Sequence, residues 1–170
     1  MANDPTQRKI FHEGELRAQK TWGDPAIWDE ARVNRLLWNA IPRELHPRIE
    51  AAPFFFLATG DKQGRCDCSF KGGGPGLIRM SAPDRMAFAD FNGNGAFMSL
   101  GNILENPQVG ILFIDFNDGS RLRVNGRAAI HDKGDILALF TDAPRVVTVD
   151  IELVVPNCSK YVPRLIPAPE

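Results

Sequence analysis

The 170-residue chain has almost no excess of charge of one sign and no long apolar run. Twenty basic residues stand against twenty-one acidic ones, which gives a formal net charge of −1. Nucleic acid binding usually needs a clustered basic face, so this balance argues against a nucleic acid partner. No apolar run approaches the roughly 18 residues that a membrane span requires. The N-terminal stretch MANDPTQRK lacks the apolar core of a signal peptide, so we expect a cytoplasmic protein with no membrane partner.

Cysteine is scarce, and the common catalytic motifs are missing. Three cysteines cannot form a closed set of disulfides. Cys66 and Cys68 lie two residues apart, so on a strand they point to the same face. Their spacing is not that of a CxxC redox motif or of half a zinc site, and we interpret both as small apolar fillers. No GxSxG, HExxH or P-loop string occurs, which leaves nucleophilic catalysis with little support.

The chain divides by its hydrophobic pattern into a helical beginning and a strand-rich remainder. In residues 5–50 apolar residues recur at three- and four-residue spacing, which indicates peripheral helices with a core-facing stripe. After Pro53 the pattern becomes one of short apolar strands separated by turns. We predict strands at 54–59, 65–70, 77–80, 85–89, 109–116, 121–130 and 146–155. A helix is predicted from about residue 95 to 105, and a short one after Asp132, which we expect to cap it.

Six or seven antiparallel strands with one or two inserted helices predict a closed or nearly closed barrel. Composition alone does not separate such a barrel from a two-sheet sandwich. The chain is long enough for one domain that buries about two-thirds of its unfolded surface.

A glycine-rich loop, Phe91-Asn92-Gly93-Asn94-Gly95, precedes the predicted helix. Its glycines allow a tight turn, and the first amides of a helix have no partner within the helix. Those amides and the helix dipole can bind an anion. The alternative is an ordinary loop in which Asn94 is the N-cap of the helix.

Lys71 favours the anion site, because it leaves a strand end close in strand order to this loop. A phosphate dianion needs a cation together with hydroxyl or amide donors. Ser69, Lys71 and the amides of residues 93–95 can supply that set. Arg121 and Arg123 share one side of their strand; they add charge if that side is the cleft and are surface residues if it is solvent.

Several segments, taken in order, resemble the FMN-binding split-barrel proteins related to pyridoxamine 5'-phosphate oxidase. They are FFFLATGDKQGRCDCSFKGGGPGLIRM from residue 54, DRMAFADFNGNGAFMSLGNILENPQVGILF from residue 84, RLRVNGR from residue 121 and NCSKY from residue 157. The resemblance covers most of the chain after residue 54. No single segment is specific to this family, but the order in which the segments occur is.

The resemblance implies a mainly β split barrel of Greek-key type at residues 53–170, with a helical extension at residues 1–52 packed on it. It also implies FMN bound at the interface of a homodimer, with the C-terminal tail reaching the flavin of the partner subunit. The cofactor-binding residues implied are Cys68, Ser69, Phe70, Lys71, Phe88, Ala89, Asp90, Asn92, Gly93, Asn94, Ser99, Asn102, Arg121, Arg123, Lys160, Tyr161 and Arg164.

The function expected from the resemblance is hydride transfer at the flavin N5, to or from an unknown small molecule. The alternative is a protein that binds, stores or senses a flavin, a deazaflavin or haem without turnover. Two departures argue against pyridoxamine phosphate as the substrate. The loop at residues 92–95 lacks the cationic residues of pyridoxamine phosphate oxidases, and Arg164 has no histidine near it in sequence.

His12, Glu13 and Glu15 form the remaining candidate site. On a helix His12, Glu15 and Gln19 share a face, and histidine with glutamate can bind a metal. Two candidate ligands without a partner cluster favour a solvated helix face instead, or a lid near the flavin, so we predict no metal.

Overall fold

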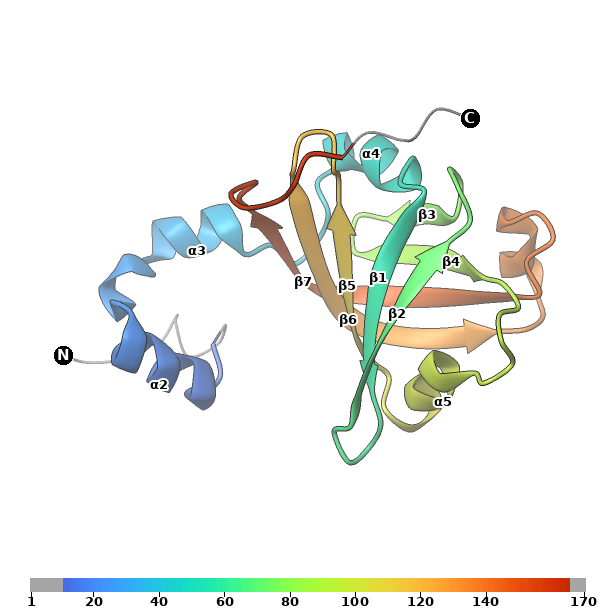
Figure 1. The fold of residues 1–170 in the computed structure, drawn as a ribbon, viewed down its shortest axis with the longest axis horizontal. Helices are drawn as coiled ribbons and strands as arrows, with labels where there is room; N and C mark the ends of the chain where they lie inside the picture. Colours follow the sequence, from blue (N-terminus) through green and yellow to red (C-terminus); the bar gives the residue numbers. More distant parts are fainter. Residues whose placement is uncertain (1–10, 166–170) are drawn as a thin grey trace. The chain divides into compact units, whose positions relative to one another are not determined.

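The computed structural model describes residues 11–165 (Figure 1). The chain divides into two compact units, one ending at Trp38 and the other beginning at Asn39. This division differs from the sequence-based one at residue 52. Residues 39–52 belong with the barrel because the N–H of Ile41 donates to the Pro83 carbonyl, and the Glu50 carboxylate accepts from the N–H of Met80.

The N-terminal unit contains α2 (Glu13–Trp22), a 3-10 helix (Pro25–Ile27) and α3 (Glu30–Leu36). His12 is the N-cap of α2 and does not lie on its face. Its Nδ1 accepts from the N–H groups of Gly14 and Glu15, while the Glu15 carboxylate accepts from the N–H of His12. This reciprocal pair is a capping box, in which histidine takes the place of the usual serine or threonine.

The second unit contains seven strands and four short helical segments. The strands are β1 (Phe54–Gly60), β2 (Cys66–Gly72), β3 (Ile78–Ala82), β4 (Arg85–Asp90), β5 (Gln108–Ile114), β6 (Arg121–His131) and β7 (Arg145–Asn157). The helical segments are two 3-10 helices (Arg43–Leu45 and Asp135–Leu139), α4 (His46–Glu50) and α5 (Met98–Glu105).

All strand pairings are antiparallel, in the order β2-β1-β5-β6-β7-β4-β3. The order is not sequential because β1 pairs with β5 and β4 with β7. The seven strands therefore form one strongly curved sheet (Figure 1), which confirms the predicted split barrel and excludes the two-sheet sandwich. Helix α5 packs against β1, β2 and β6, and α4 packs against β3.

The barrel core is built from the inward-facing residues, which alternate with outward-facing residues along the strands. Phe55 lies at its centre, with ring centroids 5.0 Å from Phe88 and 5.7 Å from Phe113. Strand β6 alternates strictly between buried and exposed residues over most of its length, as expected for a sheet with one solvated face. Within residues 11–165, no helix is long and apolar enough to cross a membrane.

Three local predictions were wrong. Helix α5 begins at Met98 and not near residue 95, because Phe97 adopts the left-handed conformation (φ 50°) and serves as the N-cap. Asp132 caps no helix; the 3-10 helix that follows it is preceded by Gly134 at φ 93°. Cys66 and Cys68 share a face as predicted, but both are exposed and so do not fill the core.

Candidate functional site

Strand β2 gives the site its first wall. Its residues alternate strictly between exposed and half-buried, so Asp67, Ser69 and Lys71 share the inner face. Cys68 and Phe70 point to the outer face, where both are exposed. The sheet order places β2 at one end, paired only with β1, so this inner face is open to the loop that precedes α5.

The loop at residues 91–97 and the start of α5 form the second wall. The Asn94 side chain accepts from the N–H of Ala96, so it stabilises the loop rather than capping the helix. Helix α5 has no side-chain cap, and its first three N–H groups, at residues 98–100, donate to no acceptor among the described residues. Ser99 and Leu100 are only 5% and 8% exposed. Backbone N–H groups in such residues are usually satisfied, so the start of α5 is a candidate site for a hydrogen-bond acceptor.

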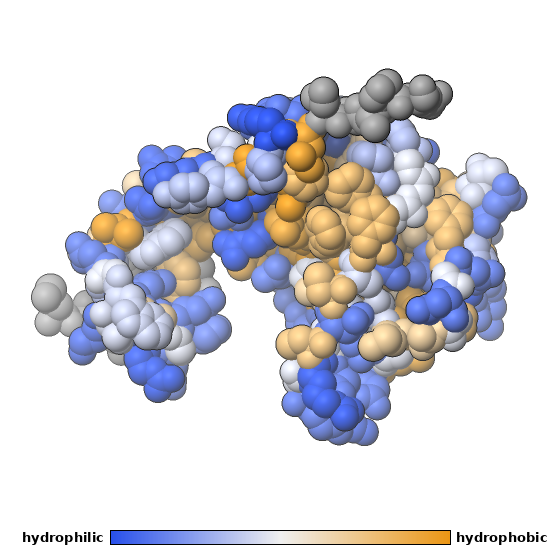
Figure 2. Space-filling view, in the orientation of Figure 1, coloured by the Kyte–Doolittle hydropathy of each residue, from blue (hydrophilic) through white to orange (hydrophobic). Residues whose placement is uncertain are grey.

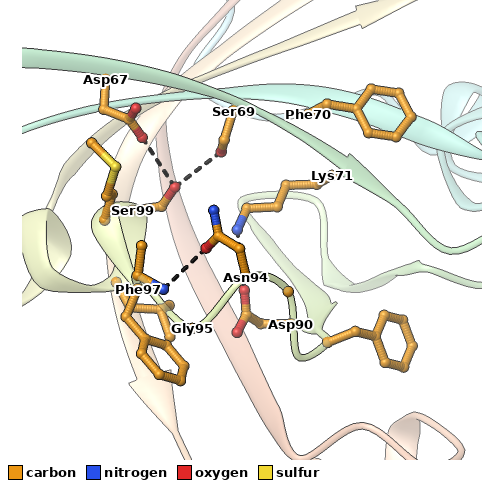
Figure 3. Close-up of a pocket in the computed structure, with 14 residues that line it drawn as sticks. Asp67, Ser69, Phe70, Lys71, Asp90, Asn94, Gly95, Phe97 and Ser99 are labelled. Atoms are coloured by element: carbon orange, nitrogen blue, oxygen red, sulfur yellow. Dashed lines mark hydrogen bonds and ion pairs between the residues drawn. The ribbon is translucent and has the colours of Figure 1, made fainter.

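The two walls enclose a pocket of about 290 Å³ (Figure 3). This volume is at the low end of the range for small-molecule sites. The pocket is lined by Asp67, Ser69, Phe70, Lys71, Asp90, Phe91, Gly93, Asn94, Gly95, Ala96, Phe97, Met98, Ser99 and Leu100.

Asp90 is held between two cations at one side of the pocket. Its Oδ1 lies 3.1 Å from Lys71 Nζ and its Oδ2 lies 3.0 Å from Arg145 Nε. The Asp90 side chain is only 6% exposed, so both of its oxygens need such partners. Two cations and one carboxylate leave a net charge of +1. Lys71 keeps two N–H groups beyond the one that Asp90 accepts.

Arg145 also connects the pocket loop to the sheet. Its Nη2 donates to the Asn92 side-chain oxygen at 2.8 Å, and its guanidinium lies 5.1 Å from the centroid of the Phe97 ring. Arg145 opens β7 and pairs directly with Asp90 across the sheet. One side chain therefore contacts the end of β4, the loop and the N-cap of α5.

Two serines and a carboxylate lie together on the other part of the pocket wall (Figure 3). Ser99 Oγ donates to Asp67 Oδ2 at 3.3 Å, and Ser69 Oγ lies 2.9 Å from Ser99 Oγ. This hydrogen-bond chain joins β2 to the first turn of α5.

The structure brings seven of the residues predicted from sequence together around the pocket: Ser69, Phe70, Lys71, Asp90, Gly93, Asn94 and Ser99. Four more lie near it without lining it. Phe88 and Ala89 are buried in the core. Asn92 accepts from Arg145, and Asn102 donates to the Thr59 hydroxyl to fix α5 on β1. Cys68 lies on the far face of β2.

The other predicted residues gather where the C-terminal tail crosses the end of β6. Arg121 donates to the Cys158 carbonyl, and Arg123 donates to the Asn157 side chain. Lys160 lies over the Tyr161 ring, 4.8 Å from its centroid. Arg164 donates to the Asn117 carbonyl. Of these contacts, only those of Arg121 and Arg164 join the tail to the barrel, and none of these residues lines the pocket of its own chain.

The sequence missed two charged residues of the site, Asp67 in the pocket lining and Arg145 beside Asp90, together with the lining residues Ala96, Phe97, Met98 and Leu100. Asp67 carried a usable signal, since it lies two and four residues from Ser69 and Lys71 on one strand and so shares their face. Arg145 carried none. It reaches the pocket through the pairing of β4 with β7, which joins residues 55 positions apart.

Comparison with known proteins agrees with the fold and supplies the family. The model of the pyridoxamine 5'-phosphate oxidase family matches residues 41–150, well over half of the chain. The chain therefore belongs to that family, whose fold is the split barrel seen here. None of the curated proteins compared with the sequence matches it.

Solved structures of the same fold share little sequence with the chain. A single-residue variant of HupZ from Group A Streptococcus is 18% identical, with a TM-score of 0.56 over 69% of this chain and 99% of that one. A candidate pyridoxamine 5'-phosphate oxidase from Lactobacillus delbrueckii is 24% identical (TM-score 0.55, 69% and 94% covered). An FMN-binding protein from Syntrophomonas wolfei is 16% identical (TM-score 0.52, 85% and 98% covered). At these identities the likeness concerns the fold alone.

Proposed function

We propose that this protein is an FMN-dependent oxidoreductase that binds FMN non-covalently in the pocket between β2 and α5. The observation that carries the proposal is the meeting of Lys71 with the uncapped start of α5, in a chain of the pyridoxamine 5'-phosphate oxidase family. A cation and unpaired backbone N–H groups together form a site for a phosphate.

The residues of the pocket fit the phosphate of FMN. Lys71 offers two N–H groups, and the amides of residues 98–100 offer donors that the protein leaves unused. Arg145 balances the charge of Asp90, so that Asp90 does not cancel Lys71. The exposed rings of Phe91 and Phe97 offer apolar surface beside these donors.

Bound FMN supplies hydride transfer at its N5. The chain supplies position: Lys71 and the start of α5 would hold the anion, and Phe97 lines the pocket beside them.

The proposal includes a homodimer with the flavin at the subunit interface, in the cytoplasm. Support comes from an apolar group made of Phe54 and Phe56 of β1, Phe70 of β2 and Phe116, which follows β5; each ring lies near at least one other. Phe70 is 62% exposed and also lines the pocket. Apolar side chains gather over this part of the barrel (Figure 2). A second subunit there would cover the group and enlarge the small pocket.

Binding without turnover is the second candidate function. Both oxygens of Asp90 are engaged by cations, so this carboxylate is not available as a general acid or base. No histidine lines the pocket among the described residues, which gives haem no imidazole ligand there.

The first experiment is a visible absorption spectrum of the purified protein, before and after FMN is added and the protein desalted. Flavin absorbance of about one FMN per subunit is expected. A colourless protein that retains no FMN contradicts the proposal and directs attention to deazaflavins. If FMN is retained, its reduction by a nicotinamide donor and its reoxidation by an acceptor distinguish an oxidoreductase from a binding protein.

A further inference from the structure

Two arginine–aspartate pairs stand at the ends of the ladder between β4 and β7. Arg85 lies opposite Asp150 at one end, and Asp90 lies opposite Arg145 at the other. The Arg85 side chain is 56% exposed, whereas the Arg145 side chain is 18% exposed. A shielded guanidinium needs partners for its five N–H groups, and a single carboxylate accepts only some of them. Arg145 therefore has N–H groups left for residues other than its sheet partner.

The additional partners of Arg145 lie near the two ends of the loop at residues 91–97. Its Nη2 donates to the Asn92 side-chain oxygen at 2.8 Å, and its guanidinium lies 5.1 Å from the centroid of the Phe97 ring. Between these contacts stand Gly93 and Gly95, and a Cβ on either glycine would have open space around it. The middle of the loop is therefore loosely packed, and Arg145 contacts it on both sides.

The Phe97 backbone has a conformation that phenylalanine rarely adopts. Its φ of 50° and ψ of 29° are left-handed, which costs energy in a residue with a Cβ. A right-handed Phe97 would extend α5 by one residue, and the N–H of Leu100 would then donate to the Ala96 carbonyl. With Phe97 left-handed, the Leu100 N–H donates to no acceptor within residues 11–165. The conformation of Phe97 thus decides how many donors the start of α5 offers.

We propose that Arg145 is a positioning residue for the anion site. Its contacts with Asn92 and Phe97 hold the loop in the conformation that leaves the N–H groups of residues 98–100 available to a phosphate. Arg145 does not line the pocket, so it acts through these two residues. The inference deepens the proposed function and rests on it, because the anion is taken to be the phosphate of FMN.

Arg145→Lys separates the two tasks of this side chain. Lysine keeps a positive charge beside Asp90, but it lacks the planar fork that can reach Asn92 and stack on Phe97 at the same time. The charge balance around Asp90 is then retained while the loop loses its support. Asn92→Ala is the second variant, because it removes one loop contact and leaves the ion pair of Arg145 with Asp90 intact.

The test is an equilibrium titration of flavin-free protein with FMN and with riboflavin, which lacks the phosphate. The ratio of the two affinities isolates what the phosphate contributes. The wild type is expected to prefer FMN. Arg145→Lys is expected to lower the ratio by about tenfold and to leave riboflavin affinity unchanged, since the phosphate loses a backbone donor. Asn92→Ala is expected to lower the ratio by a smaller factor.

A rescue distinguishes positioning from a general structural role. Glycine adopts the left-handed conformation without strain, so the loop of Phe97→Gly needs less support from Arg145. In the Phe97→Gly background, Arg145→Lys is therefore expected to lower the affinity ratio by less than it does in the wild type. Arg85→Lys is the matched control, because it makes the same substitution in the exposed pair at the other end of the ladder. It is expected to leave the ratio unchanged.

Three results would overturn the inference: a wild type without preference for FMN over riboflavin, equal losses of both affinities in Arg145→Lys, or the same effect of Arg145→Lys with and without Phe97→Gly. If the wild type binds no flavin at all, the proposed function fails. The positioning role is then tested with inorganic phosphate, while the N–H resonances of residues 98–100 are followed by NMR. Shifts that disappear in Arg145→Lys retain it, whereas equal shifts in both proteins, or none in the wild type, overturn it.

Discussion

The Asp90 carboxylate pairs with two cations, Lys71 and Arg145. The effect of replacing either cation on stability or binding follows from that arrangement. Lys71 and Arg145 each occupy one carboxylate oxygen, and all three side chains are largely shielded from water. Removal of either cation leaves Asp90 with an unpaired oxygen in a poorly solvated place. The two cations differ, however, in what else they do. Lys71 faces the pocket, whereas Arg145 connects strands and loop.

Lys71→Ala is expected to weaken FMN binding by about 1.5–3 kcal/mol, since it removes one charge-assisted contact to the phosphate. The measurement is a fluorescence titration with FMN. Lys62→Ala is the matched control, because Lys62 is an exposed lysine paired with Glu105 outside the pocket. Unchanged affinity in Lys71→Ala would remove Lys71 from the site.

Arg145→Gln is expected to lower the free energy of unfolding by about 1.5–3 kcal/mol, because a largely buried ion pair loses one partner. Urea denaturation measures the effect. Arg85→Gln is the control: Arg85 pairs with Asp150 at an exposed site, where such pairs contribute little to stability. Equal decreases in the free energy of unfolding in the two variants would show that burial of the Asp90 ion pairs does not add to stability.

The site could be predicted at the residues whose position depends on local pattern alone. Ser69, Lys71 and the loop at 91–95 follow from strand alternation and glycine spacing. Arg145 could not be found, because its partner Asp90 is set by the register between β4 and β7. The start of α5 was predicted too early in the sequence. It is set by the left-handed backbone of Phe97, and phenylalanine rarely adopts this conformation, so the sequence gives no sign of it.

At the scale of elements, the strands were predictable because a change from helical to strand periodicity and strong turn sequences mark them. Six or seven strands were expected, and residues 11–165 contain a sheet of seven. Their order was not accessible from periodicity, since β1 with β5 and β4 with β7 are pairings between distant segments. The resemblance to a known fold supplied what the pattern lacked.

Gly126 lies opposite a bulge in β7: Asn125 pairs with Leu153 and Gly126 with Ile151, so the register shifts at this point. A Cβ at this position would overlap the carbonyl oxygen of Asp150, so the two strands approach closely only because Gly126 has no side chain. We expect Gly126→Ala to lower the free energy of unfolding by about 1–3 kcal/mol or more, as measured by thermal and urea unfolding.

Gly101→Ala is the contrast to that prediction. A Cβ at Gly101 in α5 has open space around it, and alanine favours helix by about 0.5–1 kcal/mol over glycine. This variant is therefore expected to be slightly more stable than the wild type. Destabilisation by both substitutions would mean that close strand approach is not what distinguishes Gly126.

At the scale of the whole molecule, the ion cluster that joins α4 to the β5–β6 turn contributes to the response to acid. Arg48 Nη2 donates to the carboxylates of Asp115 and Asp118 and to the Ser120 hydroxyl. The N–H and hydroxyl of Ser120, followed by Arg48, lower the pKa of Asp118 well below its usual value. The N–H of Asn117 and, against the effect of burial, Arg48 also lower the pKa of Asp115.

A carboxyl whose folded pKa is depressed contributes stability above its unfolded pKa and loses that contribution as the pH falls toward the folded pKa. The free energy of unfolding is therefore expected to fall as the pH drops below about 4. Asp118→Asn should flatten this acid limb in urea unfolding series taken across the pH range. Asp132→Asn lies outside the cluster and is the control; an equal flattening there would assign the acid response to net charge instead.

Phe70→Ser is expected to shift the proposed homodimer toward monomer and to weaken FMN binding as the protein is diluted. The reason is that the Phe70 side chain belongs to the exposed aromatic group, while the same residue borders the pocket that a second subunit would complete. Sedimentation at several concentrations measures the assembly. Leu139→Ser, at an exposed apolar residue outside that group, is the control. A wild-type protein that is monomeric at all concentrations contradicts the dimer.

Backbone N–H groups at the start of α5 and in the β6–β7 ladder are expected to differ widely in how fast they exchange hydrogen with solvent. The ladder is paired continuously from Arg121 with Asn157 to His131 with Val146, apart from its single bulge. The N–H groups of residues 98–100 have no acceptor among the described residues. Any anion that seats there would slow their exchange while leaving the ladder unaffected. Occupancy of the pocket can thus be followed in a crude mixture of metabolites, before the ligand has been identified.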